Sequence, residues 1–150
     1  MALNPAILDE PASILVTQVE RGRIRQFATA IGETNPVYHD LDAARSAGHP
    51  DLLAPPTFLF GLELEQSEVF DVLARYGVDI SQVLHGEQTF EYHGLVHAGD
   101  EVRFSTRGVD LYSKAGGTLD FLVRRTEVTR SDELVATFSS VTVIKNGSAA

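Results

Sequence analysis

Four long segments after Gly77 alternate apolar and polar residues, and this pattern constrains the fold more than any other feature of the chain. Their ranges are 83–93, 100–112, 118–130 and 134–145. Alternation with a period of two is typical of strands that bury one face. Turn-like residues separate the segments, as at Ser131 and Asp132. The C-terminal half therefore predicts an antiparallel sheet.

The first half of the chain has a helical pattern instead. Apolar residues recur at helical spacing over 20–31, and Gly32 follows where a helix commonly ends. A second short helix is expected at 40–48. Residues 52–77 predict two consecutive helices or one broken helix that begins at a pair of prolines. The start of this segment is apolar around most of its circumference, which is typical of a helix buried on several sides.

Together these elements predict one α+β domain over residues 1–150. A short strand is expected at 13–19, after an extended N-terminal arm at 1–12, and residues 146–150 are expected to be a frayed tail. A chain of this length can bury its own core. With one buried helix and a long sheet, the economical arrangement wraps the sheet around the helix.

Composition argues against several classes of function. The formal net charge of −9 argues against nucleic acid as a partner, because binding its phosphate backbone requires clustered Lys and Arg. The chain has no cysteine, and therefore no disulfide, thiolate metal site or cysteine nucleophile. It has neither a run of about 18 apolar residues nor a leader-like N-terminus. We expect a cytoplasmic protein without a membrane partner. The arginines available for an anionic ligand are Arg45, Arg103, Arg124 and Arg125.

The stretch GETNPVYHD gathers side chains that can move protons. Glu33 supplies a carboxylate, Asn35 precedes a proline that fixes a turn, and Tyr38 and His39 follow. One carboxylate and one imidazole are enough to pass a proton to and from water. The same residues can also be purely structural, as a solvated carboxylate, an Asx-type turn, a buried phenol and an exposed loop histidine.

Other polar groups give weaker signals. His85, Glu87 and His93 share one face of a predicted strand, which describes either a polar site or the solvent side of the sheet. Their spacing is not that of a zinc site, and we expect no metal. Gly116 and Gly117 belong to a hairpin turn rather than a phosphate loop, because no helix follows them.

In their order along the chain, these motifs resemble the MaoC-like dehydratases and (R)-specific enoyl-CoA hydratases of the hot-dog fold. The stretches that carry the resemblance are GETNPVYHD, AAR with its following Gly48, APPTF, HGEQTFEYH and HAGDEV. More closely, the chain resembles their "dehydratase N-terminal", or FAS1-like dehydratase, subgroup, which is related to the smaller subunits of mycobacterial fatty-acid dehydratases. The resemblance covers residues 19–144.

The resemblance implies an activity and a kind of assembly. It implies hydration of a trans-2-enoyl thioester, or dehydration of a 3-hydroxyacyl thioester, carried on coenzyme A or acyl carrier protein. No cofactor other than this carrier is implied. Hot-dog domains usually pair through their sheets, which also removes an exposed edge. We therefore expect a homodimer, or a heterodimer with another hot-dog subunit.

The loop departs from the pattern of the active family members, which is G-D-x-N-P-x-H with the Asp and the His sharing the catalytic water. The Gly, Asn and Pro are present here. Glu33 occupies the Asp position and Tyr38 the His position, so that His39 lies one residue out of register. A phenol with a pKa near 10 is a poor base at neutral pH, and His39 is the better base if the loop turns it inward.

The start of the central helix departs from the pattern too. Active members place a His-Gly pair there, whose backbone N–H polarises the thioester carbonyl as an oxyanion hole does. Here the pair is Pro55-Pro56, and proline has no N–H, so the donor must come from Thr57 or a later residue. Gly61 would let an acyl chain pass close to the backbone; alternatively, the apolar residues here only fill the core. The candidate substrate contacts are Pro56, Thr57, Phe58 and Gly61.

Two functions remain open from the sequence. In the first, a homodimer hydrates enoyl-CoA through Glu33 and His39, with Asn35 and Tyr38 shaping the site. In the second, this chain holds the acyl group and a hot-dog partner supplies an intact Asp-and-His pair. The substitution at the His position and the two prolines favour the second function.

Overall fold

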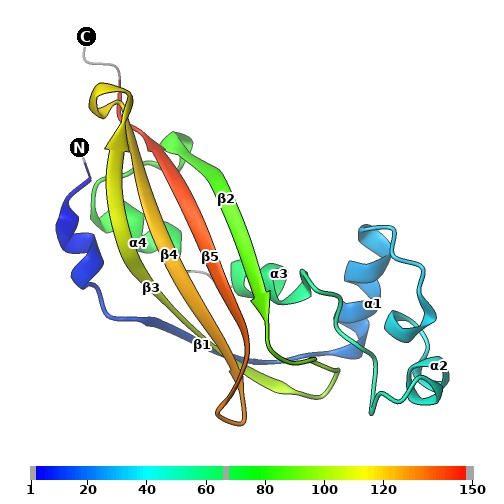
Figure 1. Ribbon diagram of the computed structural model, residues 1–150. Helices are drawn as coiled ribbons and strands as arrows, with labels where there is room; N and C mark the ends of the chain where they lie inside the picture. The colour runs from blue at the N-terminus through cyan, green and yellow to red at the C-terminus, as the bar shows by residue number, and fades with distance from the viewer. Residues whose placement is uncertain (1–2, 66–67, 148–150) are drawn as a thin grey trace.

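The computed structural model describes residues 3–65 and 68–147 (Figure 1). In chain order the elements are η1 (Pro5–Asp9), β1 (Ser13–Gln18), α1 (Arg21–Ala30), η2 (Pro36–Tyr38), α2 (Leu41–Ser46), α3 (Phe58–Leu64), α4 (Val69–Arg75), η3 (Ile80–Gln82), β2 (Val83–Tyr92), β3 (Glu101–Lys114), η4 (Ala115–Gly117), β4 (Leu119–Arg130) and β5 (Glu133–Lys145). The η elements are 3-10 helices. The α+β prediction is confirmed.

The five strands form a single antiparallel sheet in the order β1-β3-β4-β5-β2. The long strands β3, β4 and β5 occupy its centre, and β1 and β2 are its edges (Figure 1). The turn between β4 and β5 has positive φ at both Ser131 and Asp132, as a tight two-residue hairpin connection requires. As the last strand of this order, β2 pairs along one side only, with β5, among the described residues.

Alternation along the strands produces the buried face that the sequence predicted. Leu122, Thr126 and Val128 of β4 are buried, whereas Arg125 and Glu127 are exposed. Side chains two apart on a strand lie on one face, so β4 presents its apolar side to the helices.

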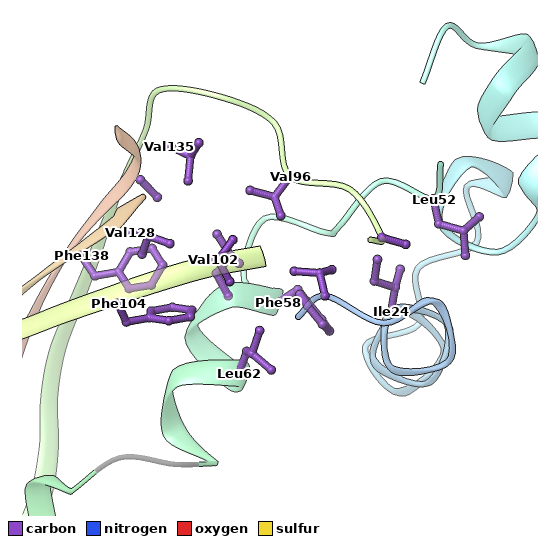
Figure 2. Packing of buried hydrophobic residues seen from close by; sticks show 14 of the residues in the cluster. Ile24, Leu52, Phe58, Leu62, Val96, Val102, Phe104, Val128, Val135 and Phe138 are labelled. Carbon is purple, nitrogen blue, oxygen red and sulfur yellow. The ribbon is translucent and has the colours of Figure 1, made fainter. Parts of the chain in front are cut away.

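Helices α3 and α4 pack against that face and close the core. Phe58 and Leu62 of α3 belong to one buried cluster with Phe104, Val128 and Phe138 of the sheet (Figure 2). A second cluster joins residues of α4 to the other end of the sheet; its buried members are Leu3, Ile7, Val69, Leu73, Leu122 and Ile144. The helices α1 and α2 lie beyond one end of α3, where they carry the candidate loop (Figure 1).

The expectation of an extended arm over residues 1–12 is wrong for its middle part. Residues 5–9 form a 3-10 helix that Asn4 caps, because its side chain accepts from the Ala6 N–H. Leu3 and Ile7 are almost fully buried, and the Leu3 N–H donates to Asp120 Oδ2 at 2.8 Å. Burial of these two apolar side chains fixes the segment on the domain.

The predicted frayed tail is only partly covered by the described residues. Asn146 is held, since its N–H donates to Thr118 O and its amide nitrogen to Gly117 O. Residues 148–150 lie outside the described part of the chain. Among the described residues, no helix has the length and apolarity to cross a membrane.

Candidate functional site

The candidate loop leaves α1 through a glycine in the left-handed conformation. Gly32 has φ +72°, and the Glu33 N–H donates to the Ala28 carbonyl at 2.9 Å. This is the geometry of a helix C-cap that satisfies the last carbonyls of the helix. The sequence prediction that α1 ends at this glycine is confirmed, and the cap sets the direction in which Glu33 leaves the helix.

Glu33 and Asn35 both bond to the backbone of the loop. Glu33 Oε1 accepts from the Asn35 N–H at 2.8 Å, and Asn35 Oδ1 accepts from the Val37 N–H at 3.2 Å. Asn35 thereby caps η2, with Pro36 at its first position. These bonds fit the structural interpretation of both residues, and neither side chain is paired with His39.

The His39 imidazole connects the two ends of the loop. Its Nε2 lies 2.6 Å from the Glu33 carbonyl oxygen, and because a carbonyl only accepts, Nε2 carries the proton. The His39 carbonyl in turn accepts from Arg25 Nε at 2.7 Å. Nδ1 is then the ring atom left to accept a proton. His39 turns toward the loop, as base chemistry would need, but it contacts the backbone of Glu33 and not its carboxylate.

Tyr38 is the residue that lies near the Glu33 carboxylate. Its ring is partly buried against the main core cluster. Desolvation raises the pKa of the Tyr38 phenol, and the negative charge of Glu33 raises it further. The phenol therefore stays protonated near neutral pH and can donate a hydrogen bond, but it cannot act as a base. The charge of Glu33 thus acts on the side chain that stands at the family's His position.

The start of α3 is built around its two prolines. The Pro56 carbonyl accepts from the Tyr92 hydroxyl, and the Phe58 N–H donates to the Pro55 carbonyl at 3.0 Å. Pro56 and Thr57 are exposed, whereas Phe58 is buried with its ring edge against Phe27, at a centroid distance of 5.7 Å. The N–H at Phe58 is thus already used inside the chain.

Gly61 faces a side chain of the core. A Cβ built there would lie 3.5 Å from Cε2 of Phe27, which is an ordinary van der Waals contact. Phe27 thus fills the space beside the helix through which an acyl chain would have to pass. At Gly61 and Phe58 the structure therefore matches the core-filling alternative.

A separate cavity lies between the N-terminal segment, the helices α3 and α4, and the strands β3 and β4. It opens to solvent. Most of its wall is apolar, through Ile7, Leu15, Val69, Leu73, Phe104 and Leu122. Seven polar residues also line it, namely Glu10, Ser13, Glu63, Glu68, Thr106, Arg107 and Arg124. The sequence did not single out Glu63 or Thr106, and it offered Arg124 only as one of four arginines.

The remaining sequence candidates are not brought together. His85, Glu87 and His93 are all exposed, and a β-bulge interrupts the pairing of β2 with β5 between the first two. This matches the solvent-side interpretation. No group of three potential metal ligands occurs in the part of the chain that the structure describes.

Comparison with known proteins gives a consistent result. The sequence model of the FAS1-like dehydratase domain region matches residues 12–138. A protein of Saccharopolyspora erythraea named UPF0336 protein is 38% identical over 133 residues, which cover 88% of this chain and 83% of that protein.

Two solved structures from Mycobacterium tuberculosis share the fold. A chain of the HadBC complex, a 3R-hydroxyacyl-ACP dehydratase, aligns with a TM-score of 0.73 and 27% identity, covering 89% of this chain and 96% of that chain. A chain of the ChsH1-ChsH2 complex aligns with a TM-score of 0.74 and 23% identity, covering 99% and 92%. The prediction of a hot-dog domain is confirmed.

Proposed function

This chain belongs to the FAS1-like dehydratase family, and we propose that it is the acyl-binding subunit of a dehydratase or hydratase built from two hot-dog subunits. Its substrate is a trans-2-enoyl or 3-hydroxyacyl thioester, with the acyl group on coenzyme A or acyl carrier protein. The partner subunit supplies the carboxylate and the imidazole that move protons to and from water. No cofactor beyond the carrier enters the reaction.

The observation that carries this proposal is the way in which the loop uses its own polar atoms. Glu33 Oε1 is occupied by the Asn35 N–H, and His39 Nε2 by the Glu33 carbonyl. A catalytic water would have to be held between a carboxylate and an imidazole, each with an atom free to bond to it. In this loop the Nε2 proton of His39 is donated to the Glu33 carbonyl, so it is not available to such a water.

The oxyanion side supports the same conclusion. Two prolines begin the turn into α3, and they have no N–H to offer to a thioester carbonyl. The Phe58 N–H donates to Pro55 O. A thioester carbonyl placed here would therefore have to accept from the Thr57 N–H, without a donor from the two positions before it.

Two other features support an acyl-binding subunit. The cavity under α3 and α4 has a mostly apolar wall, as an acyl chain requires. The edge strand β2 exposes the apolar surfaces of Leu84 and Tyr92 beside its free backbone groups. An unpaired edge of this kind suits pairing with a second sheet. The two similar structures described above are likewise complexes of named subunits.

One observation favours a second candidate, in which the chain is active alone. Glu33 and Tyr38 are close enough for the carboxylate to raise the phenol pKa. In this candidate function the phenol donates a hydrogen bond where other family members have an imidazole, and Glu33 is the base.

Turnover by the purified chain separates the two candidates. We expect no loss of the conjugated absorbance of crotonyl-CoA or of longer enoyl-CoAs with the chain alone, and turnover when it is co-expressed with a neighbouring hot-dog subunit. Light scattering on the same samples gives the assembly state. Turnover by the chain alone, at the rate of the mixed assembly, would overturn the proposal.

Variants of this chain, measured in the active assembly, show whether this chain or its partner carries the proton-transfer groups. Glu33→Gln, Tyr38→Phe and His39→Gln each remove a proton-transfer group while nearly keeping side-chain volume. If the partner carries out the chemistry, each variant keeps its rate within about threefold, against the roughly 10²- to 10⁴-fold loss that follows removal of a catalytic acid or base. A loss of that size in Glu33→Gln would assign the chemistry to this chain.

A further inference from the structure

Two histidine side chains meet where the helices α1 and α2 join the rest of the domain (Figure 1). His49 follows α2, and His97 lies in the turn before β3. His49 Nδ1 lies 3.1 Å from His97 Nε2, and the two ring centroids are 5.1 Å apart. Both residues are partly buried. The proposed function uses neither of them.

The turn that carries His97 is fixed to the sheet. The His97 N–H donates to Asp100 Oδ2 at 2.9 Å, and Arg130 of β4 pairs with the same oxygen at 3.2 Å. Arg130 also donates to the Leu95 carbonyl at the start of this turn. The backbone at His97 therefore has a defined position, from which its ring meets His49.

The segment that carries His49 also holds the candidate loop. Leu53 forms an antiparallel bridge with His97. The Leu53 N–H donates to the Val37 carbonyl of the loop at 3.2 Å. Residues 49–54 thus contact the turn at 95–100 on one side and the loop at 32–40 on the other. A change at the two imidazoles is two backbone contacts away from the loop.

The geometry of the two rings limits the number of protons that they can hold. When both imidazoles are neutral, one of the facing nitrogens donates an N–H and the other accepts it. One extra proton can bind the outer nitrogen of the donor ring without breaking this hydrogen bond. A second extra proton places an N–H on both facing nitrogens, because an imidazolium has no acceptor. Two like charges then also repel each other, so the rings must separate.

The groups around the His97 ring make its protonation unfavourable. Burial lowers the pKa of His97 most, and the neighbouring His49 imidazole lowers it further. Asp100 of the same turn and Asp51 beyond α2 raise this pKa, whereas Arg130 of β4 lowers it. Each carboxylate is itself paired with an arginine, at 3.2 Å and 2.6 Å respectively. His97 therefore takes up its proton at a lower pH than a free histidine does.

We propose that the pair of His49 and His97 is an acid-sensitive contact, which holds residues 49–54 against the turn at 95–100 near neutral pH and opens in weakly acidic solution. Opening occurs when both rings are protonated, and it loosens the loop at 32–40 because Leu53 supports that loop. His97 binds its proton more weakly in the folded than in the unfolded chain. The contact's contribution to stability is therefore complete above the unfolded pKa of about 6.5 and is lost as pH falls toward the folded pKa. This inference does not depend on the proposed function.

The first test measures the coupling between the two rings. Urea denaturation of the full chain is compared for the wild type, His49→Ala, His97→Ala and the double variant, at about pH 7.5 and about pH 5. At the higher pH the pair should raise the equilibrium constant for folding by roughly two- to tenfold beyond the sum of the single effects. At the lower pH this coupling should vanish or change sign. A coupling that is absent at pH 7.5, or equal at both pH values, would overturn the inference.

His85→Ala is the matched control, because His85 is exposed on β2. Its effect on the equilibrium constant should differ by less than about twofold between the two pH values. If the variants of the pair do not fold, NMR titration of the wild-type imidazoles replaces the cycle. His97 should then titrate below about pH 6.5, the ordinary value for histidine. Titration of His97 at the ordinary value would show that the second proton is not excluded, and the inference would fail.

A third measurement tests whether the contact opens. Hydrogen exchange of the Leu53 N–H is followed at both pH values and corrected for the intrinsic effect of pH. Protection of this amide should fall at least about tenfold at the lower pH in the wild type, but not in the double variant, which has no pair to open. The Val72 N–H of α4, which donates to Glu68 O, should keep its protection. Unchanged protection at Leu53 would mean that the rings titrate without releasing the segment, and the proposed opening would be refuted.

Discussion

Polar side chains are used in opposite ways by two regions of the molecule, the loop at 32–40 and the cavity wall formed by α3, β3 and β4. In the loop, Glu33, Asn35 and His39 each bond to the loop's own backbone. In the wall, Arg124 keeps a buried Nε–H with no partner among the described residues. The region that resembles a catalytic motif bonds three of its side chains to its own backbone, whereas the region that resembles core contains a buried donor without a partner.

This difference predicts unequal contributions of the two regions to stability. A hydrogen bond formed in an exposed loop replaces one with water and contributes about 0.5–1.5 kcal/mol net. A buried donor left unpaired destabilises the fold by roughly 1–3 kcal/mol. The loop bonds therefore hold its shape, while the wall contains a group that destabilises the fold.

The largest expected effect comes from removing the countercharge in the wall. Glu63→Leu leaves Arg124 without its neighbouring carboxylate and deprives the hydroxyls of Thr106 and Thr126 of their acceptor. We expect a loss of about 3 kcal/mol in the free energy of unfolding, since breaking a buried pair costs roughly 3–5 kcal/mol and this one is partly accessible. Urea denaturation measures it. The loop variant Glu33→Leu, by comparison, should lose only about 1 kcal/mol; equal losses would remove the contrast between the two regions.

Replacing both charges of the wall should reverse that loss. In Glu63→Leu/Arg124→Met no charge remains in an apolar setting, and the hydroxyls of Thr106 and Thr126 can still bond to each other, so stability should return to about the wild-type value. The same urea titration gives the comparison. A double variant that is less stable than Glu63→Leu alone would show that Arg124 stabilises the wall through its packing, despite its charge.

The sheet was predictable because its signal is local. The segments 83–93 and 118–130 correspond to β2 (Val83–Tyr92) and β4 (Leu119–Arg130), since period-two alternation and turn residues are properties of neighbours in sequence. The 3-10 helix at Pro5–Asp9 was missed because two prolines near the N-terminus suggested extension. Its position depends on burial of Leu3 and Ile7 against distant residues.

The two polar regions likewise differ in how far neighbours in sequence reveal their contacts. The sequence identified the loop residues, but which atom of His39 meets Glu33 depends on the turn at Asn35 and on rotamers. For Arg124, a long side chain on the inner face of a strand often reaches solvent, and only the packing of α3 shows that most of this one is covered. Its parity with Leu122 was the available signal.

The next test compares the effects of two glycine substitutions on stability. It asks whether the left-handed backbone at Gly32 positions the loop. Gly32 has φ +72°, so Gly32→Ala should cost about 1–2 kcal/mol. Gly22 lies inside α1 with open space around it, and Gly22→Ala should instead stabilise the protein by about 0.5–1 kcal/mol. Thermal unfolding of both variants measures the pair. A neutral Gly32→Ala would mean that the cap geometry does not position the loop.

The smallest expected effect is a titration that tests the one side-chain pairing in the loop. Desolvation and then the charge of Glu33 raise the pKa of Tyr38, so its phenolate absorbance should appear above the ordinary range near pH 10. Because the folded protein holds this acid protonated, its contribution to stability is complete below the unfolded pKa and is lost as pH rises toward the folded pKa. Tyr38→Phe should therefore lose less stability than the wild type in alkali and match its pH dependence near neutrality.

Glu33→Gln should lower the pH at which the Tyr38 phenolate appears, but not to that of free tyrosine, since desolvation remains. If Glu33→Gln leaves the transition unmoved, the carboxylate and the phenol are not neighbours in solution, and the chain loses the pairing on which independent activity would depend.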